Sequence, residues 1–308
     1  MPGQRVGFAY AGQKHKSCKK ASKQICIELA QNNATIDHLC HNKNINGTLL
    51  RQYTSYSANK MTAMKTIIII AATPLEIAAL AEAFHAQPHP APLPWEIFVA
   101  DETFIKILFV VSGIGTSNAS AATAVAAQLF APDLIITTGC GGAYPGSGLE
   151  IGGIALATSE VFADEGVVTP EGWQSLEQIG IPLLERNGKR YFNEITLSPP
   201  AIAAALEAAG QPGSAPVTAG RFLTVATCSG TNARGTELTD RFRGICENME
   251  GAAVALMAAR YGIECLELRG ISNFVEDRNR RRWNISLAVT NSQRFLEHFI
   301  RNQVACKQ

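Results

Sequence analysis

The sequence of 308 residues lacks the patterns that mark several common classes of protein. No apolar run reaches the roughly 18–20 residues that a helix needs to cross a bilayer, so we expect no membrane partner. The eight cysteines form no Cys-x-x-Cys pair and no secretory apolar core accompanies them, which is typical of reduced thiols in the cytoplasm. A Gly-rich loop ending in Lys-Ser or Lys-Thr is also missing, which argues against a phosphate loop of the ATPase type.

The whole chain has almost no excess of one charge sign, with a formal net charge of +1, but its two parts have opposite excesses. Residues 1–63 carry nine Lys and Arg against two Asp and Glu, whereas residues 64–308 carry 18 against 24. The larger part therefore lacks the basic excess of a nucleic-acid binder, and we expect no nucleic-acid partner. Residues 1–63 also show no sustained periodicity, which predicts a basic, disordered leader or an extension upstream of the true start.

Neither a metal nor a cofactor is indicated. After Gly113 and Gly115, the third position of a dinucleotide fingerprint is occupied by Asn118. The possible metal ligands in the first part of the chain match no standard zinc spacing: Cys18, Cys26, His38, Cys40 and His41. We therefore expect no bound metal and no cofactor.

Beyond the first part of the chain, apolar strands alternate with helices. The pattern predicts a buried strand at Thr66–Ala71 and helices at Pro74–Phe84 and Glu250–Tyr261. Such alternation is typical of an α/β three-layer sandwich with a central mixed, largely parallel sheet, and we predict that residues 64–308 form one domain. A looser stretch at about 163–197 predicts a lid or an insertion.

Three polar residues stand where strands end or helices begin. Glu76 lies in the first turn of a predicted helix, Glu250 opens another, and Asn273 follows the strand predicted at Ile263–Ile271. In an α/β sheet such positions can meet at one rim, where ligands bind. Each alone is better explained as a charge favoured by the helix dipole or as a turn residue. Together they predict a pocket for a nucleoside.

Two glycine-rich segments are expected at the same rim. Ser112–Gly115 follows one predicted strand, and Gly139–Gly142 follows another at Leu134–Thr138. Glycine lets the backbone approach a ligand closely, although each segment alone fits an ordinary strand–helix turn.

Five motifs give the chain from about 65 to 303 a resemblance to a known family. They are Ala72-Thr-Pro-Leu-Glu76, Ser112-Gly-Ile-Gly115, Thr138-Gly-Cys-Gly-Gly142, Asn248-Met-Glu-Gly-Ala-Ala253 and Ser272-Asn-Phe-Val-Glu-Asp277. The chain is similar to the purine nucleoside phosphorylase / methylthioadenosine–adenosylhomocysteine nucleosidase family, which implies that family's fold. The segment Val275–Trp283 resembles the futalosine-hydrolysing branch, of the menaquinone pathway.

The resemblance implies roles for individual residues. Glu76 matches the glutamate that activates water, Glu250 the carboxylate that binds ribose hydroxyls, and Met249 the side chain packed on the sugar. Phosphorylases of the family clamp phosphate with arginines where this chain has Glu76 and Thr137. Because a carboxylate repels phosphate and suits a base toward water, we expect hydrolysis of an N-glycosidic bond.

Asn273 stands where methylthioadenosine nucleosidases have an aspartate that protonates the purine. An asparagine amide donates to O6 of hypoxanthine, and its carbonyl accepts from a protonated N7. A mispaired buried polar group costs about 1–3 kcal/mol, so the residue favours a 6-oxopurine nucleoside such as futalosine.

Further residues are expected to contact substrate. Four arginines beside Trp283 are candidates to pair with the benzoate of futalosine, although a solvated basic loop explains them equally well: Arg278, Arg280, Arg281 and Arg282. The remaining candidates are Gly139, Cys140, Phe162, Cys228, Ser229 and Ser272.

Three alternative functions remain open at this point. They are a methylthioadenosine, adenosylhomocysteine or aminodeoxyfutalosine nucleosidase, a 6-oxopurine phosphorylase, and a nucleoside-sensing module without turnover. Family analogy implies a homodimer or larger homo-oligomer.

Overall fold

The computed structural model describes residues 64–91, 93–210 and 215–305, which belong to the unit Met64–Gln308. The predicted leader, with its cysteines and histidines, lies outside the described residues. Within the described ranges, no helix is long and apolar enough to cross a membrane.

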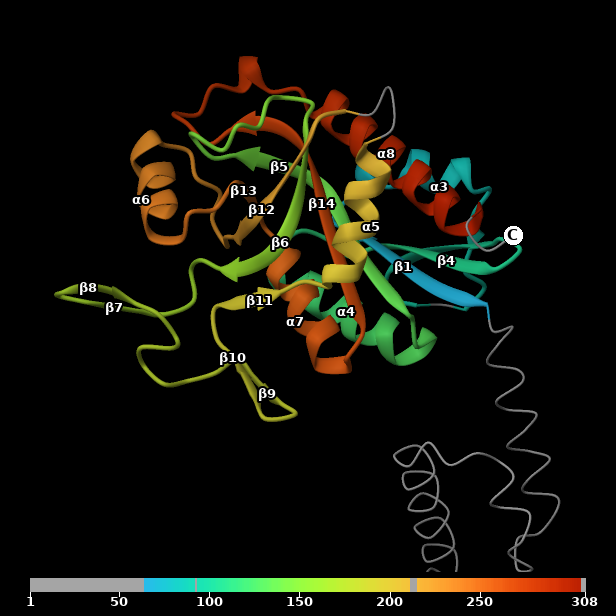
Figure 1. Cartoon of the computed structure of the whole chain (residues 1–308), viewed down its shortest axis with the longest axis horizontal. Coiled ribbons are helices and arrows are strands. Elements are labelled where there is room, and N and C mark those ends of the chain that lie inside the picture. The colour runs from blue at the N-terminus through green and yellow to red at the C-terminus, as the bar shows by residue number, and fades with distance from the viewer. Residues whose placement is uncertain (1–63, 92, 211–214, 306–308) are drawn as a thin grey trace, which may run out of the picture. The chain divides into compact units, whose positions relative to one another are not determined.

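The elements follow one another in an α/β order (Figure 1). The first half contains β1 (Lys65–Ala71), η2 (Pro74–Glu76), α3 (Ala78–Ala83), β2 (Gln87–Pro88), β3 (Glu96–Asp101), β4 (Ile105–Val111), α4 (Thr116–Phe130), β5 (Leu134–Ala143) and β6 (Ile154–Phe162). The middle contains β7 (Val167–Thr169), β8 (Gly172–Gln174), β9 (Leu184–Arg186), β10 (Lys189–Tyr191), β11 (Glu194–Thr196) and α5 (Pro199–Ala209). The last part contains β12 (Val217–Thr224), α6 (Asn232–Phe242), β13 (Cys246–Asn248), α7 (Gly251–Tyr261), β14 (Glu264–Phe274), η3 (Arg280–Arg282) and α8 (Ile285–Ala305).

The described strands form a ten-stranded mixed sheet that closes on itself at one end. Its order is β11-β6-β12-β13-β5-β1-β4-β3-β2, and β14 pairs with both β5 and β6. Strands β6, β12, β13, β5 and β14 therefore make a closed ring, and the prediction of a plain three-layer sandwich is wrong in this respect. Register shifts at Gly220/Arg221 and Ile271/Asn273 bend strands of this ring.

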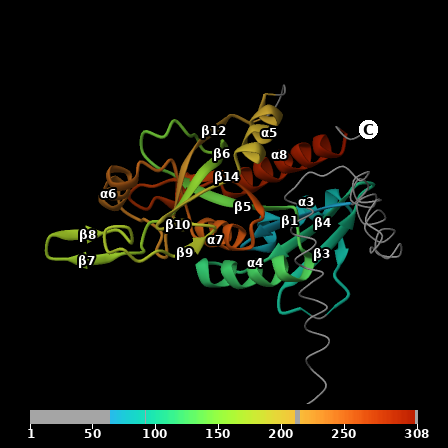
Figure 2. The ribbon, with the colours of Figure 1, turned by 60° about the horizontal axis from the view of Figure 1, so that its bottom comes forward.

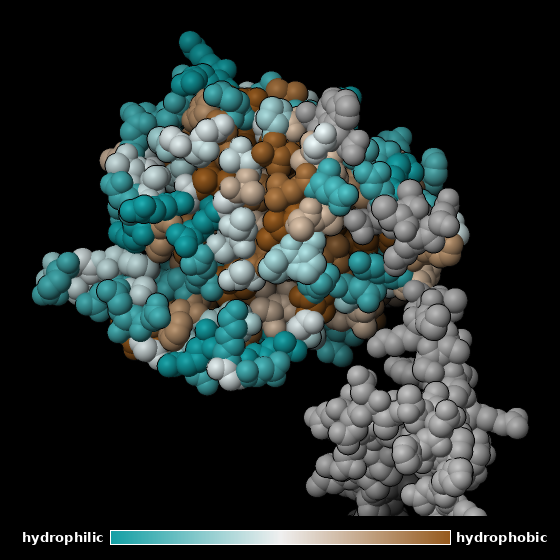
Figure 3. Space-filling view, in the orientation of Figure 1, coloured by the Kyte–Doolittle hydropathy of each residue, from teal (hydrophilic) through white to brown (hydrophobic). Residues whose placement is uncertain are grey.

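Alternation along the central strands builds a hydrophobic core on each face of the sheet. In β1, Ile68 and Ile70 pack with residues of α4 and α7, whereas Ile67 and Ile69 pack with residues of α3, α5 and α8. Figure 2 shows these two groups of helices on opposite sides of the strands. Hydrophilic side chains cover much of the face in Figure 3, with an apolar band across its middle.

The helix predicted at Pro74–Phe84 is interrupted. A 3-10 turn, Pro74–Glu76, comes first, and Ile77 has φ −137°, which is not helical. Glu76 folds back onto Thr73 as a capping box, so the chain turns before α3 begins. The prediction of one continuous helix is therefore wrong.

The segment Gly139–Gly142 is also not the predicted loop. It continues β5 to Ala143, because β14 pairs with β5 along this whole stretch. A strand this rich in glycine leaves its two faces open to side chains from neighbouring elements.

The looser stretch at 163–197 contains short hairpins. Strands β7 and β8 pair with each other, as do β9 and β10, and both views show β7–β8 extending away from the sheet. Trp173 of β8 packs edge-on against Phe242 of α6, with ring centres 5.3 Å apart. Whether this region acts as a lid stays a prediction.

Candidate active site

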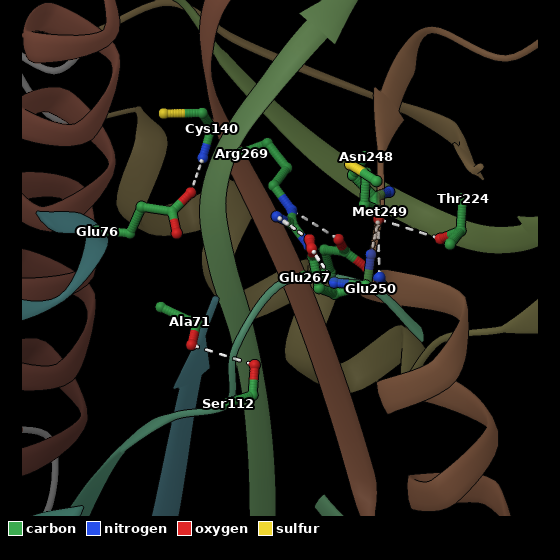
Figure 4. Close-up of polar contacts among 12 residues, drawn as sticks. Ala71, Glu76, Ser112, Cys140, Thr224, Asn248, Met249, Glu250, Glu267 and Arg269 are labelled. Atoms are coloured by element: carbon green, nitrogen blue, oxygen red, sulfur yellow. Dashed lines mark hydrogen bonds and ion pairs between the residues drawn. The ribbon is translucent and has the colours of Figure 1, made fainter. Parts of the chain in front are cut away.

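Glu76 is buried and fixed in orientation. Its Oε2 accepts hydrogen bonds from Thr73 N at 3.0 Å and Thr73 Oγ1 at 2.9 Å. Its Oε1 accepts from Cys140 N of β5 at 2.9 Å, as Figure 4 shows. The carboxylate is therefore held against the middle of the sheet, unlike a solvated charge that merely favours a helix start.

A buried arginine of β14 links the acids of this region. Arg269 is 2% exposed, its Nη1 lies 3.3 Å from Glu250 Oε2, and its Nε lies 2.9 Å from Glu267 Oε1. Burial by itself would lower the pKa of Arg269, but the charges of Glu267, Glu250 and Glu76 raise it above its usual value. The guanidinium is therefore a permanent positive charge, directed at Glu267 and Glu250 (Figure 4).

Gly139 lets Glu76 and Arg269 approach one another. It pairs with Arg269 in the β5–β14 register and has φ +151°. A Cβ at this position would lie 2.5 Å from Glu76 Oε1 and 3.0 Å from Arg269 Nη1. Glycine is needed here because a larger residue would displace the acid, the guanidinium or both.

Glu250 is the N-cap residue of α7 and is also buried. Its Oε1 accepts a hydrogen bond from Gly115 N at 2.9 Å, at the start of α4. Gly115 has φ +92°, a conformation that favours glycine. The segment Ser112–Gly115 and Glu250 therefore lie together, as expected for groups at one edge of the sheet.

Asn273 lies within β14 and not in a turn after it. It pairs with Gly142, three residues along β5 from Gly139, which corresponds to roughly 10 Å. Ser272 Oγ donates to Asn273 Oδ1 at 2.8 Å, and Asn273 Nδ2 donates to Phe274 O at 3.0 Å. One amide hydrogen and one carbonyl lone pair of Asn273 are left for a ligand.

The predicted sulfur and hydroxyl residues near Glu250 also come together. Met249 Sδ lies 3.2 Å from Cys228 Sγ. Ser229 donates to the buried Glu247 from its backbone N at 2.8 Å and from Oγ at 2.6 Å, and Tyr144 Oη donates to the same carboxylate at 2.9 Å. Glu247 therefore anchors the segment that carries Cys228 and Ser229.

Two predicted contact residues have different surroundings. Burial, and then the charge of Glu76, raise the pKa of the Cys140 thiol to about 12, so this thiol is neutral at physiological pH. Phe162 is 7% exposed and belongs to the hydrophobic core. Contact of either side chain with a substrate stays a prediction.

The arginine-rich segment after β14 is exposed. The Arg278 guanidinium lies 4.8 Å from the centre of the Trp283 ring, and Arg282 forms an ion pair with Glu276 at 2.7 Å. Neither Arg278 nor Arg280 forms an ion pair with another described residue. With Arg281, which also forms no ion pair with a described residue, the segment thus presents three cations that are not neutralised by neighbours in the described part of the chain.

The sequence analysis did not identify the buried polar residues that surround Glu76 and Glu250. They are Thr224, Asn248, Glu267 and Arg269. A signal for two of them was present, because Glu267 and Arg269 are charged, stand two apart in an apolar strand, and therefore share one face.

The comparisons with known proteins agree with this architecture. Residues 66–301 match the phosphorylase superfamily. The futalosine hydrolase of Acidothermus cellulolyticus is 36% identical over 233 residues, which cover 75% of this chain and 87% of the relative. The futalosine hydrolase of Streptomyces coelicolor is 31% identical over 242 residues, covering 72% and 90%.

A solved structure shares the fold. The native structure of futalosine hydrolase of Helicobacter pylori superposes with a TM-score of 0.66 at 21% identity, covering 78% of this chain and 98% of that one. The chain therefore belongs to the phosphorylase superfamily, within which it is similar to futalosine hydrolases.

Proposed function

We propose that the protein hydrolyses the N-glycosidic bond of futalosine, releasing hypoxanthine and dehypoxanthinyl futalosine in menaquinone biosynthesis. The observation that carries the proposal is that Glu76 and Asn273 both meet the glycine-rich end of β5, Glu76 at Cys140 and Asn273 at Gly142. One is an acid that suits water, and the other is an amide that suits a 6-oxopurine. Identities of 31% and 36% to two futalosine hydrolases support the same conclusion.

The sugar is assigned to Glu250 and Met249. Each Glu250 oxygen already has one partner, Gly115 N or Arg269 Nη1, and keeps a lone pair for a ribose hydroxyl. As the bond to the base breaks, positive charge develops at the anomeric carbon. A fixed negative carboxylate beside the sugar stabilises that charge as it forms, which is usually the largest catalytic contribution. Met249 packs on the sugar ring.

The attacking water is assigned to Glu76. Its three hydrogen bonds fix the carboxylate without using all of its lone pairs. Water adds its oxygen to the anomeric carbon and gives a proton to Glu76. Arg269, whose Nη1 lies near Gly139, places a positive charge close to the acid.

The base is assigned to Asn273. The bonding electron pair leaves with hypoxanthine, whose N7 takes up a proton from solvent. The free amide hydrogen of Asn273 donates to O6, and the carbonyl accepts from N7–H. Adenine carries an amino group where hypoxanthine has O6, so this donor would face the amide donor of Asn273.

Hydrolysis is favoured over phosphorolysis by the charge of the site. The buried charged residues described are the glutamates 76, 160, 247, 250 and 267 and a single arginine, Arg269. Because that guanidinium is already balanced by carboxylates, a phosphate dianion beside Glu76 would lack a counter-charge.

The far end of futalosine is assigned to the arginine-rich segment. Its benzoate carboxylate would pair with Arg278 or Arg280, and its ring suits the apolar face of Trp283. Arg282 is less suited, because Glu276 already neutralises it.

The test is an assay of the full chain with futalosine, aminodeoxyfutalosine and methylthioadenosine, each with and without inorganic phosphate. Liquid chromatography would quantify the released base. We expect hypoxanthine from futalosine at a rate that phosphate does not change. Strict dependence on phosphate would establish a phosphorylase, and preferential adenine release would establish a 6-aminopurine nucleosidase. Binding of futalosine without release of base would establish a nucleoside sensor.

Three wider proposals accompany the activity. We propose that residues 64–308 are the nucleosidase domain, which the family match over 66–301 supports. The free thiols of Cys140, Cys246 and Cys265 support action in the reducing cytoplasm. Family analogy is the ground for a homodimer or larger assembly, which light scattering of the purified protein would test.

A further inference from the structure

Two fully buried acids meet beneath the start of α7. Glu160 of β6 and Glu267 of β14 are both 0% exposed. A Cβ at Gly251 would collide with Glu160 Oε1 and with Glu267 Oε2, so both carboxyl groups lie against the same backbone carbon. Since two carboxylates in such a place cannot both be ionised, the pair must hold a proton.

The surroundings assign the proton to Glu160. Burial raises the pKa of Glu160 well above its usual value, and the charge of Glu267 raises it further. Burial also raises the pKa of Glu267, but the charge of Arg269, bonded to its Oε1 at 2.9 Å, opposes that rise. Glu267 is therefore the anion of the pair.

A shared proton also explains an otherwise unpartnered atom. Among the described residues, Glu267 Oε2 is buried without a hydrogen-bond partner, and it lies against the same side of Gly251 as Glu160 Oε1. A proton carried by Glu160 and donated to Glu267 Oε2 satisfies it.

The remaining neighbours of the pair are neutral. Thr224 Oγ1 lies 2.8 Å from Glu160 Oε2, and Asn248 Nδ2 donates to Glu160 Oε1 at 2.5 Å. The thiols of Cys246 and Cys265 are within electrostatic reach, and burial raises the pKa of each well above its usual value. Arg269 and Glu250 are therefore the charged groups next to Glu267.

Two routes connect this pair to Glu250. Arg269 bonds Glu267 through Nε and reaches Glu250 Oε2 through Nη1 at 3.3 Å. Asn248, which bonds Glu160, accepts from the backbone N of Glu250 at 3.0 Å through its Oδ1. One route fixes the carboxylate of Glu250 and the other fixes its backbone.

We propose that Glu160 and Glu267 are positioning residues that share one proton and thereby hold Glu250 in place for the sugar. Neutral Glu160 leaves Glu267 as the counter-charge of Arg269, and Arg269 then holds the Glu250 carboxylate. This inference rests on the proposed function only through the role of Glu250.

An infrared measurement on the full chain without substrate tests the shared proton. We expect a carbonyl stretch of a protonated carboxyl group at neutral pH, and we expect Glu160→Gln to remove it. Glu194→Gln is the matched control, because Glu194 lies on the adjacent strand β11 in a partly exposed ion pair with Arg221. Absence of the band from the unmodified protein, or its persistence in Glu160→Gln, would overturn the proposal.

Kinetics test the positioning role. We expect Glu267→Gln to lower kcat/KM on the order of 100-fold, the cost of a small displacement at a reacting site. Glu160→Gln should lower it far less, because a neutral amide replaces a neutral acid. A larger loss in Glu160→Gln than in Glu267→Gln would overturn the assignment of the proton to Glu160. Unchanged kinetics of Glu267→Gln, with a melting temperature that shows it is folded, would overturn the positioning role of the pair. Failure of the unmodified protein to hydrolyse futalosine would reject the proposed function but leave the infrared result intact.

Discussion

The choice of base gives the sharpest prediction, because one atom of Asn273 decides it. In Asn273→Asp an oxygen replaces Nδ2, which donates to Phe274 O at 3.0 Å. The new oxygen either repels that carbonyl or takes up a proton and donates to it. In both cases the amide hydrogen that would bind O6 of hypoxanthine is lost, whereas a carboxyl group can accept from a 6-amino group.

The size of the effect follows from the half-buried position of Asn273. A mispaired polar group in such a place costs about 1–3 kcal/mol, equivalent to a loss of about 5- to 160-fold in kcat/KM. We therefore expect Asn273→Asp to lower kcat/KM for futalosine by this factor. We also expect the ratio of kcat/KM for aminodeoxyfutalosine to that for futalosine to rise. The acceptor role toward Ser272 Oγ is retained, so the local fold should survive.

The assay is a competition between futalosine and aminodeoxyfutalosine, with chromatography of the released hypoxanthine and adenine. Asn279→Asp is the matched control, because Asn279 is exposed and its side chain accepts only from Arg281 N, which an aspartate can equally do. This control should leave the ratio of products unchanged. If Asn273→Asp kept the original preference between the two substrates, the reasoning about this residue would be refuted.

Four further outcomes are expected. Glu76→Gln should lower kcat by about 10²- to 10⁴-fold while futalosine still binds by calorimetry, and full activity would remove Glu76 from the mechanism. Arg278→Ala should raise KM about tenfold for futalosine but not for inosine, because a charge-assisted bond to benzoate is lost; equal effects on both would contradict that contact. Gly139→Ala should lower the free energy of unfolding by about 1–3 kcal/mol, measured in urea against Gly210→Ala, whose Cβ would meet Glu207 O at an ordinary contact distance of 3.6 Å. In the folded protein the Cys140 thiol has a pKa of about 12, whereas in the unfolded chain it ionises near 9.0, so the free energy of unfolding should fall with pH above pH 9. Cys140→Ser should reduce the slope of this fall by about 1 kcal/mol per pH unit.

Local patterns predicted the elements that depend on nearest neighbours. The strand at Thr66–Ala71 and the helix opened by Glu250 match β1 and α7 within a residue or so, because each has a continuous apolar period and a clear boundary. The interruption at Ile77 was not predicted, although the capping box between Glu76 and Thr73 is local. The other contact of Glu76, with the backbone N of Cys140 64 residues away, depends on the tertiary fold.

Pairing between distant strands decided the rest of the fold. Gly139–Gly142 reads as a loop in isolation, because glycine weakens a strand, but β14 supplies ladder partners along its whole length. The same long strand also pairs with β6 and closes the ring that the sequence did not predict. No local pattern specifies which edges of a sheet meet.

The sequence by itself determined the family resemblance, the three polar positions and the chemical preference that each side chain carries. Residue type fixes whether a group donates, accepts or bears charge, and spacing places it at a strand end or a helix start. Only the tertiary structure decided that Glu76 bonds Cys140 of β5, that Glu250 meets Arg269 of β14 and that Asn273 pairs with Gly142 of β5. Burial and the approach of groups distant in the chain set those charges, because desolvation and Coulomb energy depend on distances in space and not on separation in sequence.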